Sequence, residues 1–329
     1  MSISHTPHEV AAPSPHRAAR QGRTPGAQGP ASPRWARPVL VRLAAMSVVL
    51  IAVQGIVQGS VMTFGDPFGN TRPLTTFLLG VVGSVLALVC YTWLVRRLER
   101  REVTELAPSG AVGGLARGAL VGTAMFGAVL VVLAALGVYQ VTGTGPVSSL
   151  LSAAGIMATA AVLEELVFRG VVFGLLETRL GTWAALLVSS ALFGAMHLIN
   201  NPHATVRVAT AIALEAGLML GAAYIATRTL WVPIGIHFAW NVVESLSGTT
   251  VSGTGGATPS LVTATLQGPT ALTGGDFGPE GGVPIVVAGC AIAAAFLVVA
   301  ARRGNLHPAG LRRTTPADST HGTPTGRRP

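Results

Sequence analysis

Three clusters of ionisable and amide side chains interrupt apolar stretches in this 329-residue sequence. Their members are, in chain order, Glu164, Glu165, Arg169, His197, His237 and Asn241. One carboxylate, one imidazole and a His/Asn pair can supply a general base, a group that positions water and two donors for an oxyanion. The set therefore suits the hydrolysis of an amide bond by an activated water molecule.

The spacing of the first cluster separates its two glutamates. Glu165 and Arg169 are four residues apart, so on a helix they share a face and can form an ion pair. Glu164 points about 100° away from Glu165, because an α-helix has about 3.6 residues per turn, and it can face a cavity. The alternative is a polar clamp between helices that only holds the structure together.

The two histidine clusters also have structural interpretations. His197 follows Gly194 and Ala195, so it can be a hydrogen-bonded packing residue beside a close helix contact. His237 and Asn241 are four residues apart and share a helix face, which fits either two donors in a site or a polar seam between helices. Each cluster lies on its own apolar segment. The catalytic interpretation therefore depends on all three clusters meeting in one site.

Other hydrolase motifs are missing from the apolar segments. They contain no HExxH and no GxSxG sequence, so a zincin or a serine hydrolase has no support. They also contain no aspartate, which argues against an intramembrane aspartyl protease.

In their order and spacing, the clusters resemble the CPBP family, the CAAX-protease and bacteriocin-processing group of intramembrane proteases. The family pattern is EExxxR, then FxxxH, then HxxxN or HxxxD. The matching residues are Glu164, Glu165 and Arg169, then Phe193 and His197, then His237 and Asn241. Each motif alone is short enough to occur by chance, but the ordered set is specific. The resemblance covers roughly residues 148–247.

The resemblance implies an intramembrane endopeptidase, similar to the type II CAAX prenyl endopeptidases, that acts on a membrane-associated protein or peptide. Glu164 would activate a water molecule that it shares with His197. His237 and Asn241 would stabilise the oxyanion. The implied supporting residues, which fix the helix of the first motif, are Glu165 and Arg169.

Two alternatives stay open for the cofactor. Glu164, His197 and His237 could form a three-ligand Zn²⁺ site, as in a metalloprotease. They could equally work without a metal, with Glu164 as a plain general base. Asn241 suits oxyanion donation better than zinc ligation.

Two other functions use the same features. A catalytically idle scaffold or a bacteriocin-immunity protein could share the fold. A transporter could use intramembrane glutamate and histidine as a proton relay, although the paired broken helices or inverted repeats of transporters are not evident in the sequence.

The composition requires a membrane around these clusters. Half of the residues are hydrophobic and only 11% are charged, whereas a soluble domain carries about 25% charged residues. The apolar runs are about 20 residues long, enough to cross a hydrocarbon core of ~30 Å. We therefore expect an all-α, polytopic transmembrane helical bundle in a lipid bilayer. The net charge of +9 does not indicate nucleic-acid binding, because the arginines lie in tails and loops beside apolar runs.

The chain can be divided into one membrane domain and two polar tails. Eight candidate spans lie at about 39–64, 75–95, 118–141, 148–176, 182–199, 206–227, 230–247 and 283–301. Residues 1–38 and 304–329 are expected to be disordered cytoplasmic tails of a transmembrane domain at 39–303, whose protease-like core spans about 148–247. The Gly/Thr/Ser-rich stretch 248–282 is expected to be a flexible loop.

All 22 basic residues are arginines, and their positions predict the topology. With eight spans, the arginines of the N-terminal tail and those at 96–101, 179, 228 and 302–303 fall on one side, and little more than Arg72 and Arg207 falls on the other. The positive-inside rule then places both termini in the cytoplasm. The all-arginine, Ala/Gly-rich composition suggests a high-GC bacterium, and so the plasma membrane of a bacterial cell.

Overall fold

The computed structural model describes residues 36–65, 70–201, 203–253 and 260–309. The chain divides into two units, Met1–Arg37 and Pro38–Pro329, and the helical bundle is the second. Most of both predicted tails lies outside the described residues. On the C-terminal side, the amide of Asn305 donates to the carbonyl oxygen of Ile225 (2.9 Å), so the chain stays against the bundle beyond the expected end of the last span.

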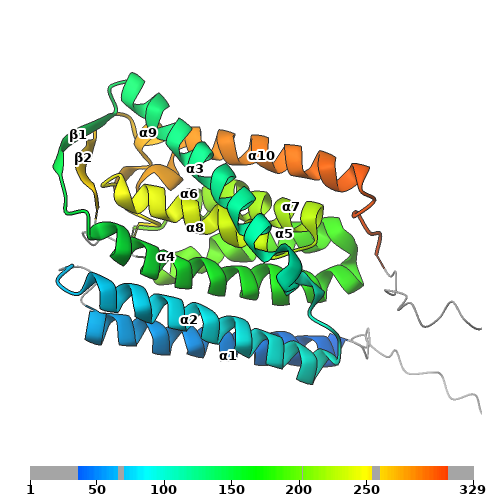
Figure 1. Cartoon of the computed structure of the whole chain (residues 1–329). Helices are drawn as coiled ribbons and strands as arrows, with labels where there is room; N and C mark the ends of the chain where they lie inside the picture. Colours follow the sequence, from blue (N-terminus) through cyan, green and yellow to red (C-terminus); the bar gives the residue numbers. More distant parts are fainter. Residues whose placement is uncertain (1–35, 66–69, 202, 254–259, 310–329) are drawn as a thin grey trace, which may run out of the picture. The chain divides into compact units, whose positions relative to one another are not determined.

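The bundle is all-α, as predicted, with one small two-stranded sheet (Figure 1). Its helices are α1 (Ala36–Ser60), α2 (Pro73–Leu94), α3 (Ala111–Ala135), α4 (Ser149–Glu165), α5 (Gly174–Asn200), α6 (Val206–Ile212), α7 (Leu218–Thr227), α8 (Trp231–Leu246), α9 (Thr270–Thr273) and α10 (Val283–Arg302). Four π-helical turns continue α1, α2, α4 and α6: η1 (Val61–Gly65), η2 (Val95–Glu99), η5 (Leu166–Phe173) and η6 (Ala213–Gly217). The 3-10 turns are η3 (Thr104–Leu106), η4 (Pro108–Gly110), η7 (Gly275–Phe277) and η8 (Pro279–Gly281).

The protein is a multi-pass membrane protein. Within the described residues, 6 helical stretches are long and apolar enough to cross a membrane, and one of them, Ser149–Ile199, has 51 residues. That stretch contains a break at Gly181, whose φ of 78° is left-handed and ends the helical path. Dividing it there and adding α8, which has 16 residues, gives the eight expected segments.

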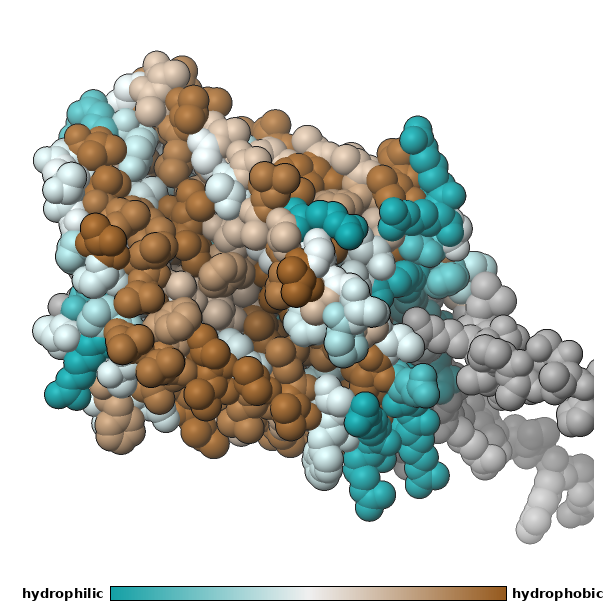
Figure 2. Space-filling view, viewed as in Figure 1, coloured by the Kyte–Doolittle hydropathy of each residue, from teal (hydrophilic) through white to brown (hydrophobic). Residues whose placement is uncertain are grey.

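Successive segments run in alternating directions between two polar ends (Figure 1). Figure 2 shows hydrophilic residues at both ends and a hydrophobic band between them, the distribution that a bilayer imposes. One end is held by a bidentate ion pair from Arg228 to Glu177 (2.6 and 2.9 Å), and Arg228 also donates to the carbonyl of Asn305. Arg101 and Arg303 lie at the same end, because the carbonyl of Glu105, the partner of Arg101, accepts from the amide of Leu230, and Arg303 donates to the carbonyl of Ala226. We call this the arginine end.

The opposite end is closed by the segment that was expected to be a loop. Strand β1 (Tyr139–Thr144) pairs antiparallel with β2 (Val262–Leu266), with Tyr139 opposite Leu266. The hydroxyl of Tyr139 donates to the carbonyl of Ser247 (2.7 Å), which joins the sheet to the end of α8. This segment thus carries short ordered elements that cap the bundle.

Small residues bring α3 and α8 into close contact. A Cβ atom at Gly118 would collide with the carbonyl oxygen of Val232, and one at Gly122 with that of Ile236. Such small-residue seams let transmembrane helices pack backbone to backbone. The seam fixes α8, the helix that carries His237 and Asn241.

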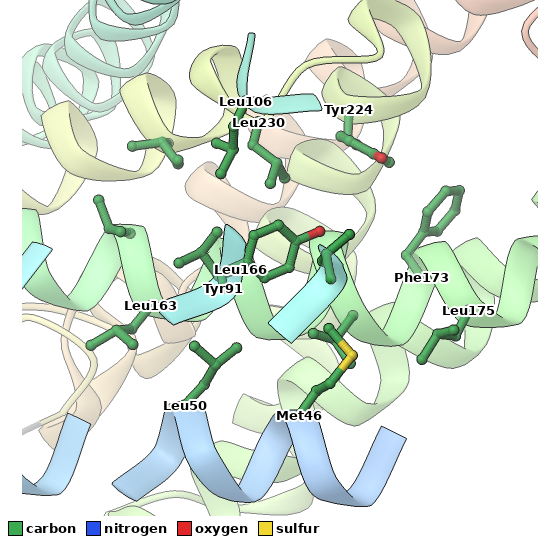
Figure 3. Packing of buried hydrophobic residues seen from close by; sticks show 14 of the residues in the cluster. Met46, Leu50, Tyr91, Leu106, Leu163, Leu166, Phe173, Leu175, Tyr224 and Leu230 are labelled. Atoms are coloured by element: carbon green, nitrogen blue, oxygen red, sulfur yellow. The ribbon is translucent and has the colours of Figure 1, made fainter. Parts of the chain in front are cut away.

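The hydrophobic interior forms two clusters of buried side chains. The first joins α1, α2, α4 and η5 and includes Met46, Leu50, Tyr91, Leu163 and Leu166 (Figure 3). The second joins α3, α5, α6, α8 and η5 and contains the aromatic residues Phe126, Phe168, Phe193 and Trp240. The turn η5, which carries Arg169, contributes to both clusters, with Leu166 in the first and Phe168 in the second.

Candidate active site

The first motif lies at the junction between α4 and the π-helical turn η5. Arg169 Nη1 donates to Glu165 Oε1 (2.8 Å), and both side chains are almost completely buried, at 1% and 0% exposed. This is the ion pair that the four-residue spacing predicts. Arg169 Nη2 also donates to the carbonyls of Ala216 (3.0 Å) and Gly217 (3.2 Å), so the guanidinium ties α4 to the chain between α6 and α7. Single π-helical turns are frequent at functional sites.

The ring of His237 lies between the two adjacent glutamates. Its Nδ1 atom is 3.0 Å from Glu165 Oε1, and its Nε2 atom is 3.9 Å from Glu164 Oε2. Glu165 Oε1 also accepts from Arg169 Nη1, so it is the acceptor here as well, and Nδ1–H donates. A carboxylate that receives one ring N–H of a histidine fixes its tautomer and orientation. Glu165 thus orients His237 as well as pairing with Arg169.

The second motif places His197 against the ring of Phe193. His197 Nδ1 lies 2.9 Å from the carbonyl oxygen of Phe193, which can only accept, so Nδ1–H donates and Nε2 is the other ring nitrogen left for a contact. The Phe193 ring lies 5.3 Å from the His197 ring and 6.2 Å from the His237 ring. The guanidinium of Arg169 stacks 4.7 Å from the same ring centre. Phe193 is therefore the common packing partner of all three motifs.

A small cavity brings the two histidines and Asn241 together. Its empty volume is about 250 Å³. Its walls are formed by Phe193, His197, Ile212, Ala216, His237, Trp240, Asn241, Ser252 and Glu280. The room inside it admits about one water molecule.

Glu164 faces a different space. Its side chain is 27% exposed and is the only ionisable group in an apolar groove of about 1310 Å³ between α1, α4 with η5, and α5. The groove is lined by Ser47, Leu50, Ile51, Gln54, Leu163, Glu164, Val167, Phe168, Val172, Leu192, Ala195, Met196 and Ile199. The site therefore has two compartments, the small cavity with His197 and Asn241 and the apolar groove with Glu164, and His237 lies beside both. The resemblance implied instead that Glu164 and His197 share one water molecule.

Three further carboxyls lie buried beside the cavity. Glu280 of η8 lines it directly, and Glu215 and Glu244 are 0% exposed with no hydrogen-bond partner for either oxygen among the described residues. Burial raises the pKa of Glu280, so its neutral form is favoured. The sequence placed Glu280 in a presumed loop. For the three buried carboxyls, the sequence showed only that Glu215 and Glu244 lie inside expected spans.

The three candidate zinc ligands, whose use was left open, are not arranged around a common point for a metal. Within the described ranges, no group of three or more His, Cys, Asp or Glu side chains could hold a metal ion. His237 Nε2 and Glu164 Oε2 are 3.9 Å apart, farther than two tetrahedral Zn²⁺ ligands at about 2.0–2.2 Å from the ion. We therefore assign no chemical step to a metal.

The three motifs fall inside one region that matches a known protein family. Residues 146–243 match the family described as type II CAAX prenyl endopeptidase Rce1-like. This confirms the resemblance read from the motifs, over nearly the same residues. No curated protein and no solved structure matches the chain.

Proposed function

We propose that this chain, whose residues 146–243 match the Rce1-like type II CAAX prenyl endopeptidases, is an intramembrane endopeptidase. Its substrate class is a membrane-associated protein or peptide. Its setting is the plasma membrane of a bacterial cell, with both termini in the cytoplasm. The reaction is hydrolysis of a peptide bond by a water molecule that a carboxylate activates.

The arrangement around His237 carries the proposal. The ring is held by Glu165, lies 3.9 Å from a Glu164 oxygen, and borders the cavity that also contains His197 and Asn241. A gap of 3.9 Å allows one water molecule to contact both His237 Nε2 and Glu164 Oε2. A buried histidine fixed in this way, next to a partly exposed carboxylate, is an acid–base pair rather than a packing contact.

In the proposed reaction, Glu164 accepts a proton from the water molecule, whose oxygen attacks the carbonyl carbon of the peptide bond. The oxyanion that forms receives hydrogen bonds from the amide of Asn241 and from Nε2–H of His237 in its doubly protonated form, whose Nδ1–H stays on Glu165. His197 lines the adjoining cavity and not the groove of Glu164, so the proposed reaction gives it no contact with this water molecule. When the C–N bond breaks, the proton on Glu164 passes to the departing amine, which restores the carboxylate.

The alternative is an idle scaffold or immunity protein on the same fold. A comparison of membrane peptides by mass spectrometry, in cells with the wild-type chain and with Glu164→Ala, separates the two. The exposed Glu102, outside the spans, provides the control Glu102→Ala. An endopeptidase leaves peptide ends that disappear only with Glu164→Ala. A scaffold leaves the same peptides in all three strains.

Asn241→Ala is expected to lower turnover by about 10²–10³-fold, because one oxyanion donor is lost. Asn241 lines the cavity, so truncation should leave the bundle folded, and the thermal midpoint should stay near that of the wild type. The measurement is the rate of peptide cleavage beside a thermal unfolding scan. A normal rate would remove Asn241 from the oxyanion site.

The topology is expected to place Pro108 and Ser260 on opposite sides of the membrane. Pro108 lies in η4, before α3, at the arginine end, and Ser260 precedes β2 in the cap. The positive-inside rule puts the arginine end in the cytoplasm. Reporter fusions at the two residues should therefore report cytoplasm at Pro108 and the outside at Ser260. Reports of the same compartment would contradict the eight-segment arrangement.

A further inference from the structure

A second groove lies at the arginine end, away from the candidate active site. Its empty volume is about 1040 Å³, and none of the motif residues lines it. The walls are formed by Leu88, Val89, Thr92, Trp93, Arg96, Arg97, Leu106 and Trp231. The groove runs along the end of α2 and η2 and is closed by η3 and the start of α8.

The two arginines of this groove form no ion pair within the described part of the chain. Arg96 and Arg97 are exposed, and neither forms an ion pair with a described residue. Their neighbour Arg101 behaves differently, since it pairs with Glu99 (2.6 Å) and Glu105 (2.8 Å). The protein therefore neutralises Arg101 internally and leaves two adjacent guanidinium groups at the mouth of the groove.

Arg101 already engages the carboxylates of Glu99 and Glu105. Burial alone would raise the pKa of Glu105, but the hydrogen bonds and charge of Arg101, with a hydrogen bond from Tyr91, hold that pKa below its ordinary value. Glu105 is thus an ionised carboxylate committed to these partners. Glu105 therefore offers no free charge to Arg96 or Arg97.

The inner walls of the groove are apolar and reach into the membrane. Val89 is 60% exposed and Trp93 is 61% exposed. Leu88 precedes Arg96 by two helical turns, about 12 Å at 1.5 Å per residue. The ring of Trp231 is fixed by a hydrogen bond from its Nε1 to the carbonyl of Ala107 (3.1 Å). Tryptophan side chains at this level are typical of the membrane interface.

We propose that this groove binds one anionic phospholipid, with its phosphate between Arg96 and Arg97 and an acyl chain along Leu88 and Val89. Guanidinium groups bind phosphate oxygens through charge-assisted, often bidentate hydrogen bonds. A free phosphate would leave the apolar wall uncovered, and a zwitterionic lipid would bring its own cationic group beside the two arginines. Only an anionic lipid satisfies both halves of the groove.

The test is native mass spectrometry of the full chain in detergent, with phosphatidylglycerol or phosphatidylcholine of the same acyl chains added. Arg96→Gln with Arg97→Gln should weaken phosphatidylglycerol binding by at least about tenfold. The matched control, Arg42→Gln with Arg302→Gln, removes the same charge from two exposed arginines that do not line the groove, and should change binding less than twofold. Val89→Trp keeps the charges but fills the groove, and should also weaken binding.

Several outcomes would overturn the proposal. Equal binding of the two lipids would show that the headgroup charge is not recognised. Equal losses of phosphatidylglycerol binding in the two double variants would mean that the net charge of the protein, and not the groove, determines binding. Unchanged binding in Val89→Trp would mean that no acyl chain lies in the groove. Displacement of the lipid by millimolar inorganic phosphate would identify a plain phosphate site.

Discussion

Glu164→Gln is expected to lower the rate of peptide hydrolysis by about 10²–10⁴-fold, the range for a positioned general base. The amide keeps the shape of the side chain but has no basic oxygen to accept the proton of the water molecule. Glu164 is 27% exposed in its groove, so the substitution leaves no buried charge without a partner, and the fold should be unchanged.

A loss of catalysis can be separated from a loss of folding by measuring the cleavage rate beside the stability of the purified protein. The cleavage rate should fall while the thermal midpoint and the elution volume of the purified protein stay those of the wild type. Glu102→Gln, at an exposed position outside the spans, should keep the wild-type rate. A Glu164→Gln protein that cleaves at the wild-type rate would remove Glu164 from catalysis and favour the idle scaffold.

Arg169→Ala is expected to give the largest loss of stability. It leaves the carboxylate of Glu165 buried at 0% exposure without its main partner, and removes the donor to Ala216 and Gly217. Removing one member of a buried ion pair costs about 3–5 kcal/mol. We expect a lower protein yield, a lower thermal midpoint and lower activity. Normal yield with full activity would show that the pair has no structural role.

A double substitution separates the two roles of Glu165. Glu165→Leu with Arg169→Leu removes both charges, and replacement of a buried pair by apolar residues is often neutral for stability. Stability should therefore recover relative to Arg169→Ala. Activity should not recover, because His237 has lost the carboxylate that orients it. Recovery of both would reduce Glu165 to a purely structural partner of Arg169.

Span length and helical spacing were sufficient to predict much of the arrangement. The length of the apolar runs predicted the segments, and the boundary expected between 176 and 182 coincides with the break at Gly181. The four-residue spacing predicted the contact between Glu165 and Arg169. These are local relations along one helix, which the geometry of an α-helix determines by itself.

Contacts between distant segments could not be predicted in this way. The hydrogen bond from His237 to Glu165 joins residues 72 positions apart. Spacing shows which face of a helix is polar but not which neighbour that face meets. For the same reason Glu164 was expected in one cavity with His197, and Glu280 was missed because its turn is polar and Gly-rich. Such a turn carries no periodic pattern that would mark it as buried.

The most direct test of the account is hydrolysis in ¹⁸O-labelled water. The purified full chain, in liposomes, is incubated with membrane peptides extracted from cells that lack it, and new carboxyl termini are identified by mass spectrometry. The account predicts ¹⁸O in new termini with the wild type and with Glu102→Gln, and none with Glu164→Gln. The absence of labelled termini with the wild type, or equal labelling with Glu164→Gln, would contradict hydrolysis by a water molecule that Glu164 activates.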